Sequence, residues 1–347
     1  MSNFVGLDVS LKEVSMCVMG GDGSVLARGS TPTDPAAVMA FIEQHAPQVE
    51  RIVHESGQLS TWLSRELLVR GAPVICIDAR LAHKALSARL NKSDSVDAEG
   101  LAHLAHTGWY RAVHIKDESS DQLRMLIGAR ERLLRIRKDI EGHVRGVLKT
   151  YGIRLAPVTA ARQRANFRTQ LRAVAKDRPA LELIAASFIV AHEAACKECA
   201  AIEKELVRRA RGNELATRLM SVPGVGPLVA LSFIVTVDDA SRFAKSTQVG
   251  AYLGLTPRRY QSGEVDYSGR ISKCGDSGTR ALLVEAAASL ISTVKRFSAL
   301  KAWAVRLVAR KGFKKASVAT ARKLAVIMHR IWRDGTTFIW QREGVSA

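Results

Sequence analysis

Residues 1–80 alternate short apolar segments with polar turns, a pattern that a layered α/β domain can bury. The Gly-Gly-Asp-Gly sequence at 20–23 is typical of a hairpin turn. The predicted strands are 4–10, 13–19, 24–28, 51–56 and 73–79, and the predicted helices in the same stretch are 35–45 and 59–71. This order of elements predicts a mixed sheet with helices packed against it.

The next part of the chain changes to long helices. Leucine, isoleucine or valine recurs every seventh residue at Leu126, Leu133, Ile140 and Val147, among many arginines and lysines. This spacing predicts an amphipathic helix with a coiled-coil-like stripe. A second long helix is predicted between Leu181 and Met220. The resulting helical hairpin either dimerises or packs on its own domain.

Charge points to a polyanionic partner. The 347 residues carry a formal net charge of +19, and residues 251–347 hold 18 Lys and Arg against 6 Asp and Glu. A basic surface of this kind favours nucleic acid. The sequence has no uninterrupted apolar run of about 18 residues, so no membrane span is expected. No signal peptide is recognised, and the odd, scattered set of five cysteines indicates a reducing, cytoplasmic compartment.

Four carboxylates form a candidate metal site. Asp8 lies within the first strand, on the face of Phe4 and Gly6, where a carboxylate is costly unless it is paired or binds metal. Glu55 ends the fourth strand, and Asp94 and Asp97 share one face of a predicted helix. Hard oxygen ligands suit Mg²⁺ or Mn²⁺, and two such ions can act on a phosphodiester. Alternatively, Ser93 caps that helix, its two aspartates favour the helix N-terminus, and Glu55 is an ordinary strand-end charge.

The segments GLDVS, VHESG and KSDSVDAEGLA resemble the three acidic motifs of the N-terminal domain of IS110-type transposases, a relative of the RuvC resolvase fold. The resemblance implies that Asp8, Glu55, Asp94 and Asp97 are that family's metal-binding catalytic tetrad. The second motif departs from the family pattern, because Ser56-Gly57 follows Glu55 where other members often have Ala-Thr-Gly. The glutamate itself is retained.

Two features mark the C-terminal part as a phosphate-binding region. The turn SVPGVGP at 221–227 has the pattern of a helix-hairpin-helix, in which Gly224 and Gly226 would let backbone amides approach a phosphate. A plain interhelical turn is the alternative. Further along, Arg258, Arg259 and Lys273 surround Ser262-Gly263. Taken by themselves, these residues favour a basic loop on the DNA backbone with an incidental serine.

The segments PGVG, GLTPRRYQSG and GRISKCGDSGTRALLVEAA resemble the C-terminal domain of the same transposase family. The resemblance implies that Ser262 is a nucleophile that forms a phosphoserine link to DNA, in a composite site with the Mg²⁺-bound tetrad of another subunit. It further implies a homo-oligomer, a dimer or tetramer, and guidance by a structured non-coding RNA.

The expected architecture is therefore an RNase H/RuvC-like α/β domain over 1–114, a helical coiled-coil insert over 115–215 and a mostly helical DNA-binding domain over 216–347. The expected function is transposition or site-specific recombination of an insertion sequence in a prokaryotic cytoplasm. Two alternatives stay open. A metal-dependent junction nuclease that uses water would form no covalent adduct, and a non-catalytic nucleic-acid-binding protein would transfer no strand.

Overall fold

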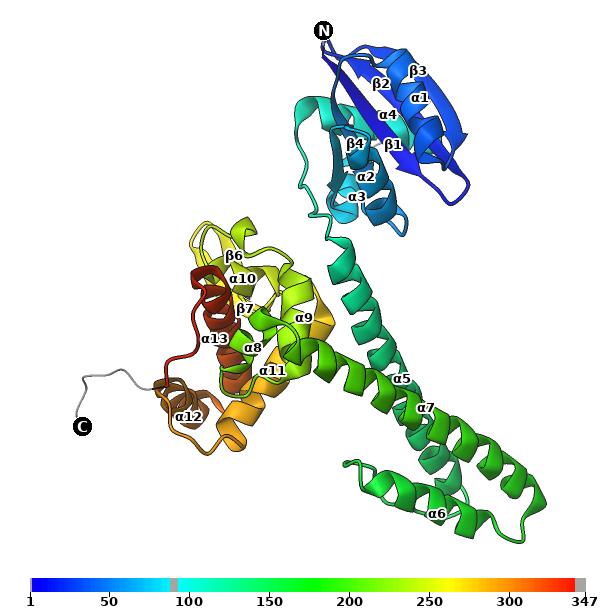
Figure 1. Cartoon of the computed structure of the whole chain (residues 1–347), viewed down its shortest axis with the longest axis vertical. Helices are drawn as coiled ribbons and strands as arrows, with labels where there is room; N and C mark the ends of the chain where they lie inside the picture. Colours follow the sequence, from blue (N-terminus) through cyan, green and yellow to red (C-terminus); the bar gives the residue numbers. More distant parts are fainter. Residues whose placement is uncertain (1, 88–92, 341–347) are drawn as a thin grey trace. The chain divides into compact units, whose positions relative to one another are not determined.

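A computed structural model of the chain describes residues 2–87 and 93–340, and it divides into two compact units, Met1–Asp117 and Glu118–Ala347 (Figure 1). The first unit ends close to the predicted limit of the first domain at residue 114. Residues 118–215 fall together with 216–347 in the second unit, and the separation of 115–215 from 216–347 into two domains stays a prediction.

The first unit contains a five-stranded mixed sheet in the order β3-β2-β1-β4-β5. Strands β1, β2 and β3 are antiparallel neighbours, whereas β4 runs parallel to both β1 and β5. The mixed sheet predicted from the sequence is confirmed. The strands are β1 (Asn3–Val9), β2 (Glu13–Gly20), β3 (Val25–Pro32), β4 (Val49–Glu55) and β5 (Val74–Ile77), and the helices are α1 (Pro35–His45), α2 (Ser60–Val69), α3 (Ala79–Leu86) and α4 (Asp94–Thr107).

Each face of this sheet has its own core, because successive residues of a strand point to opposite faces. Val5 and Leu7 of β1 pack with residues of α1 and α2. Phe4 packs on the opposite face with residues of α4. Figure 1 shows α1 and α4 on opposite sides of the sheet. The alternation predicted for the first strand is confirmed.

Gly6 allows α4 to lie directly on β1. A Cβ atom at Gly6 would lie 2.1 Å from the carbonyl oxygen of Ala98 and 2.3 Å from the amide nitrogen of Ala102. These are backbone atoms, so they cannot move aside as a side chain can. The absence of a side chain at Gly6 therefore sets the distance between the helix and the strand.

The second unit begins with a helical hairpin of α5 (Glu118–Lys149) and α7 (Pro179–Arg211), with α6 (Gln163–Ala175) packed on α7. Both long helices also contact α9, and Leu206 and Ala210 of α7 belong to the core of the C-terminal part. The remaining elements are α8 (Glu214–Met220), α9 (Pro227–Val237), η1 (Ala240–Arg242), α10 (Thr247–Tyr252), β6 (Pro257–Ser262), β7 (Val265–Ile271), α11 (Ser277–Ser292), α12 (Ala299–Lys311) and α13 (Phe313–Asp334).

The heptad stripe predicted for α5 is only partly right. Ile140 is buried against the hairpin core, but Val147 is 40% exposed and Leu148 is buried in its place. A straight helix drifts about 20° per heptad away from a strict seven-residue repeat. Because the drift accumulates, the last residue of the stripe leaves the packed face.

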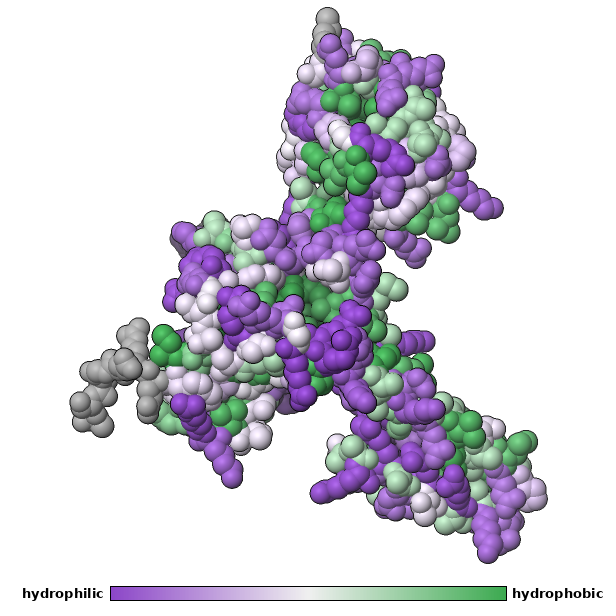
Figure 2. All heavy atoms as spheres, viewed as in Figure 1, coloured by the Kyte–Doolittle hydropathy of each residue, from purple (hydrophilic) through white to green (hydrophobic). Residues whose placement is uncertain are grey.

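One face of α7 is apolar and uncovered. Leu183, Ile184 and Val190 are 72%, 49% and 67% exposed. Apolar side chains are visible on the surface at the α6–α7 end of the hairpin (Figure 2). By length and composition alone, α7 is long and apolar enough to cross a membrane, and a single helix of this kind is weak evidence for one.

Replacement of Gly6 with alanine tests the close packing of α4 on β1. Because the added methyl group meets backbone atoms of α4, we expect Gly6→Ala to lower the free energy of unfolding of the first unit by about 3 kcal/mol. Chemical denaturation of the full chain measures this change. Gly57→Ala is the matched control, since a Cβ atom at Gly57 meets no atom within 4 Å. Equal stability of the two variants would contradict the proposed constraint.

Candidate functional site

Strand register places Asp8 and Glu55 side by side. Strands β1 and β4 are parallel and paired as far as Leu7 with His54, so Asp8 and Glu55 are the next residues on the two strands. Leu7 packs on the side of the sheet that faces α2, and the His54 ring bonds to Ser64 of α2. By alternation, Asp8 and Glu55 point to the opposite face, the one that α4 covers. Both residues are half-buried.

Helix α4 brings two more carboxylates to the same end of the sheet. Its packed face includes Ala98 and Leu101. Asp94 and Asp97 lie seven and four residues before Leu101, so they share this face of α4 and lie nearer its N-terminus than Ala98 does. Ala98 lies over Gly6 of β1. Two turns further along α4, the Ala105 carbonyl oxygen accepts a hydrogen bond at 3.0 Å from Nη1 of Arg51, which lies near the start of β4.

The N-terminus of α4 therefore points toward the carboxyl ends of β1 and β4. Ser93 caps this helix, because its Oγ accepts a hydrogen bond from the Val96 amide at 3.4 Å. The capping role that the sequence offered as an alternative is thus present beside the carboxylates. It does not conflict with metal binding, since the cap uses the serine oxygen and leaves both aspartate side chains on the helix surface.

The chemistry of this donor set fits a hard divalent ion such as Mg²⁺ or Mn²⁺. All four residues lie at one end of the first unit. Within residues 2–87 and 93–340, however, no three His, Cys, Asp or Glu side chains form a group that could hold an ion. The grouping of these four residues therefore rests on the register of β1 and β4 and on the packed face of α4.

Two further residues, to which the sequence assigned no role, fix the local geometry around Glu55. His54 is fully buried, with Nε2 2.7 Å from Ser64 Oγ and Nδ1 3.0 Å from the Glu55 carbonyl oxygen. Burial lowers the pKa of His54, which favours the neutral ring. The Ser56 hydroxyl oxygen accepts a hydrogen bond at 3.2 Å from the Ala79 amide at the start of α3. The serine that departs from the family pattern thus holds the turn after β4.

In the second unit, Ser262 lies at the tip of a two-stranded hairpin. The sequence predicted a basic loop at this point, whereas the structure shows β6 and β7 joined by Gly263-Glu264, with Ser262 paired to Val265. Gly263 has φ +56°, as required of a glycine at the first turn position of a type II′ hairpin. Ser262 is exposed. The turn therefore presents its hydroxyl to solvent.

The three cations that the sequence grouped with Ser262 have different surroundings. Arg259 is held by both oxygens of Asp266, with Nε–Oδ1 at 2.9 Å and Nη2–Oδ2 at 2.6 Å, which raises the pKa of Arg259 and lowers that of Asp266. Arg258 donates one hydrogen bond to the Ser272 carbonyl oxygen at 3.2 Å. Lys273 is exposed, at φ +56°. Arg258 and Lys273 are therefore freer than Arg259, but the strand register places both toward the base of the hairpin, at the end away from Ser262.

The glycine turn between α8 and α9 has the predicted helix–turn–helix form. Gly224 has φ +85°, and a Cβ atom there would lie 2.4 Å from the Ala286 carbonyl oxygen of α11. Close packing on α11 thus accounts for Gly224. Gly226 is open, with nothing within 4 Å of an added Cβ, and it caps α9. Of these two glycines, only Gly226 has open space where a side chain would be, and its role in phosphate binding stays a prediction.

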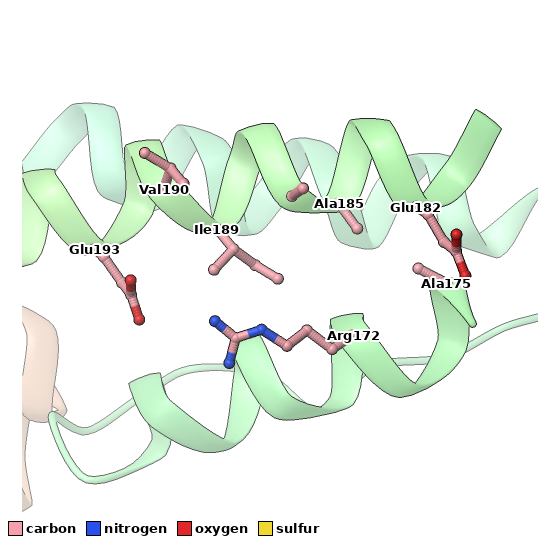
Figure 3. Close-up of a pocket in the computed structure, with 8 residues that line it drawn as sticks. Arg172, Ala175, Glu182, Ala185, Ile189, Val190 and Glu193 are labelled. Atoms are coloured by element: carbon pink, nitrogen blue, oxygen red, sulfur yellow. The ribbon is translucent and has the colours of Figure 1, made fainter. Parts of the chain in front are cut away.

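A pocket of about 250 Å³ lies between α6 and α7, apart from all these residues. Along α7 its wall is apolar between Glu182 and Glu193, and Arg172 extends from α6 beneath Ile189, toward Glu193 (Figure 3). The pocket contains none of the predicted site residues.

Comparison with known proteins identifies two matching regions. Residues 5–153 match the DEDD transposase profile of the IS110 group, and residues 216–302 match the profile described as Transposase IS116/IS110/IS902 family. The transposase for insertion sequence element IS1111A of Coxiella burnetii is 30% identical over 80% of this chain and 76% of its own length.

Two further relatives match over different lengths. A putative transposase of Sinorhizobium fredii, y4pF/y4sB, is 30% identical over 71% of this chain and 64% of its own length. The pilin gene-inverting protein of Moraxella bovis is 28% identical over 36% of this chain and 39% of its own. With the two matching regions arranged in the same order as the acidic and serine sites, the chain belongs to the IS110 family of transposases, enzymes of DNA recombination.

Proposed function

We propose that this chain moves an insertion sequence by site-specific recombination, with Ser262 as the nucleophile and a divalent ion at Asp8, Glu55, Asp94 and Asp97. The observation that carries the proposal is that each candidate site falls inside one of the two matching transposase regions, 5–153 and 216–302. The printed functions of the relatives, transposition and pilin gene inversion, are both rearrangements of DNA. The organisms of these relatives are bacteria, in keeping with action in a bacterial cytoplasm.

The proposed chemistry conserves the energy of the phosphodiester. The Ser262 hydroxyl oxygen attacks phosphorus, a phosphoserine bond forms, and the bond from phosphorus to one DNA oxygen breaks. The serine proton is lost and the leaving DNA oxygen gains one, so the step balances without ATP. A hydroxyl of a second strand then attacks the phosphoserine, which releases Ser262 and joins the DNA.

The cations of the hairpin fit DNA binding along the strand rather than contact with the reacting phosphorus. Arg258 and Lys273 lie toward the base of the hairpin, because Pro257 pairs with Ile271 there whereas Ser262 pairs with Val265 at the tip, so we assign them to DNA phosphates away from the one that Ser262 attacks. Arg259 is held by Asp266, so we assign it to the hairpin structure first and to DNA second. A divalent ion at the acidic tetrad would supply further positive charge for the DNA oxygens.

A structured non-coding RNA is part of the proposal through the family resemblance. The net charge of +19 gives the chain the capacity to bind RNA beside DNA. Transcription of the non-coding DNA that flanks the gene, followed by a binding assay, tests this part separately.

Replacement of Asp8 tests the acidic site. We expect Asp8→Asn to lower recombination in Mg²⁺ or Mn²⁺ by about 100-fold or more, because one metal ligand is lost while the strand can still form. Assays of strand cleavage and DNA binding on the same preparation separate chemistry from affinity. Glu43→Gln is the control, since Glu43 is an exposed carboxylate of the same unit. Unchanged recombination by Asp8→Asn would rule the site out.

Replacement of Ser262 tests the covalent step. Wild-type enzyme incubated with end-labelled DNA should yield a protein-linked strand on a denaturing gel, and Ser262→Ala should yield none while still binding DNA. Ser268→Ala is the control, because Ser268 is an exposed serine of the same hairpin. Recombinant product without any adduct, or normal recombination by Ser262→Ala, would favour the alternative in which a metal-dependent nuclease uses water.

We further propose that the exposed apolar face of α7 contacts a second copy of the chain. Leu183 and Val190 lie seven residues apart, so they share one side of the helix, and both are more than half exposed. Burial of such side chains stabilises an interface by about 25 cal/mol per Å² of apolar area. The family resemblance also implies a dimer or tetramer.

Added charge on this face should dissociate the oligomer. We expect Leu183→Glu with Val190→Glu to shift sedimentation toward the monomer with little change in melting temperature. Asn166→Glu with Thr169→Glu adds the same charge to exposed positions of α6 and should leave the oligomer intact. Identical sedimentation of the two double variants would refute the α7 interface.

A further inference from the structure

The β6–β7 hairpin carries an exposed aromatic pair next to Ser262. Tyr260 and Tyr267 face each other across the two strands, and their rings stack with centroids 5.0 Å apart and planes inclined by 18°. They are 45% and 56% exposed. Neither hydroxyl has a hydrogen-bond partner among the residues that the structure describes.

Register places this pair on the same face of the hairpin as the serine. Tyr260 lies two residues before Ser262 on β6, and Tyr267 lies two residues after Val265 on β7, while Ser262 pairs with Val265. Side chains two residues apart on a strand share a face. Val265 is 57% exposed, so the face presents two aromatic rings, one apolar side chain and the serine hydroxyl together.

The opposite face of the hairpin differs in chemistry. It carries Gln261, Ser268 and the ion pair of Arg259 with Asp266. The two charges on that face form an ion pair with each other, so they do not require a charged binding partner. The aromatic face carries large apolar side chains that remain exposed to solvent. Exposed apolar side chains that gather on one face are typical of a binding surface.

Stability of the hairpin explains only part of this arrangement. The Tyr260 ring lies close to Gly269, where a Cβ atom would be 3.0 Å from its Cε2 atom, so the ring covers the glycine. A cross-strand aromatic pair also stabilises an isolated two-stranded ribbon. Neither role requires both rings to stay about half exposed on the side of Ser262.

We propose that Tyr260 and Tyr267 form a stacking site for an unpaired nucleobase next to the phosphate that Ser262 attacks. This inference rests on the proposed function of Ser262. Two strand residues span about 7 Å, so a base on the rings belongs to a nucleotide adjacent to that phosphate. The base must leave the duplex, because inside a stack both of its faces are covered.

Charge complementarity supports nucleic acid as the occupant. Arg258, Arg270 and Lys273 are exposed toward the base of the hairpin and directly after it, where they can bind phosphates on the side of the base away from Ser262. Aromatic stacking accepts any base, since every base has a π-face. The pair would therefore hold the scissile nucleotide in place without selecting its sequence.

Photocrosslinking locates the base directly. The full chain carrying Ser262→Ala, which cannot react, is bound to single-stranded oligonucleotides spanning the element border, with 5-iodouracil placed in turn at each position around the cleavage point. We expect mass spectrometry to find crosslinks to Tyr260 or Tyr267 at one or two adjacent positions. Crosslinks confined to Gln261 and Ser268, or absent from the hairpin, would overturn the proposal.

Affinity measurements separate stacking from hairpin stability. Tyr267→Phe keeps an aromatic ring and should bind the single strand as wild type does, whereas Tyr267→Val keeps strand-forming character and should bind about 10-fold more weakly. Gln261→Ala, on the opposite face, should have no effect. Equal binding by Tyr267→Phe and Tyr267→Val would reject the stacking site.

The two proposals can fail independently. Crosslinks to the tyrosines without any wild-type covalent adduct would retain the base-binding site and reject Ser262 as nucleophile. An adduct through Ser262 without tyrosine crosslinks would retain the nucleophile and reject the stacking site.

Discussion

The contact between α4 and β1 at Gly6 sets the geometry on which the acidic site depends. A single missing side chain lets the helix backbone rest on the strand, with the Ala98 carbonyl oxygen where a Cβ atom would otherwise lie. Because the helix runs antiparallel to the strand, its N-terminus and both of its aspartates come to the strand ends that carry Asp8 and Glu55. A larger residue at position 6 would move two of the four carboxylates away from the other two.

The serine site uses a different physical principle. A hairpin with no buried side chain is held by its backbone ladder, by the Arg259–Asp266 ion pair on one face and by the tyrosine pair on the other. A glycine turn then ends the strand at Ser262. Exposed, charged and short, this element can present a nucleophile to a bulky polyanion, which a serine in a packed core could not do.

The sequence predicted the strands and helices of the first unit well, because the alternating apolar residues of its strands are buried in the two cores of the sheet. The strands around Asp8 and Glu55, and the Ser93 cap of α4, follow from local patterns and are confirmed. It missed β6 and β7 because both faces of that hairpin are exposed, so no apolar period marks it. Two signals were nevertheless available: the glycine after Ser262 and the tyrosines flanking it. The pairing of Arg259 with Asp266 and the close approach of Gly224 to α11 depend on tertiary contacts, which a single sequence does not display.

The most direct test of this account is the location of bound Mn²⁺ by anomalous diffraction from crystals of the full chain. The account predicts manganese at the carboxyl ends of β1 and β4, with Asp8 as a ligand together with Glu55 and at least one aspartate of α4. Manganese bound only elsewhere, or at this end of the sheet without Asp8 among its ligands, would contradict the central claim that packing of α4 on Gly6 assembles a metal-binding catalytic site.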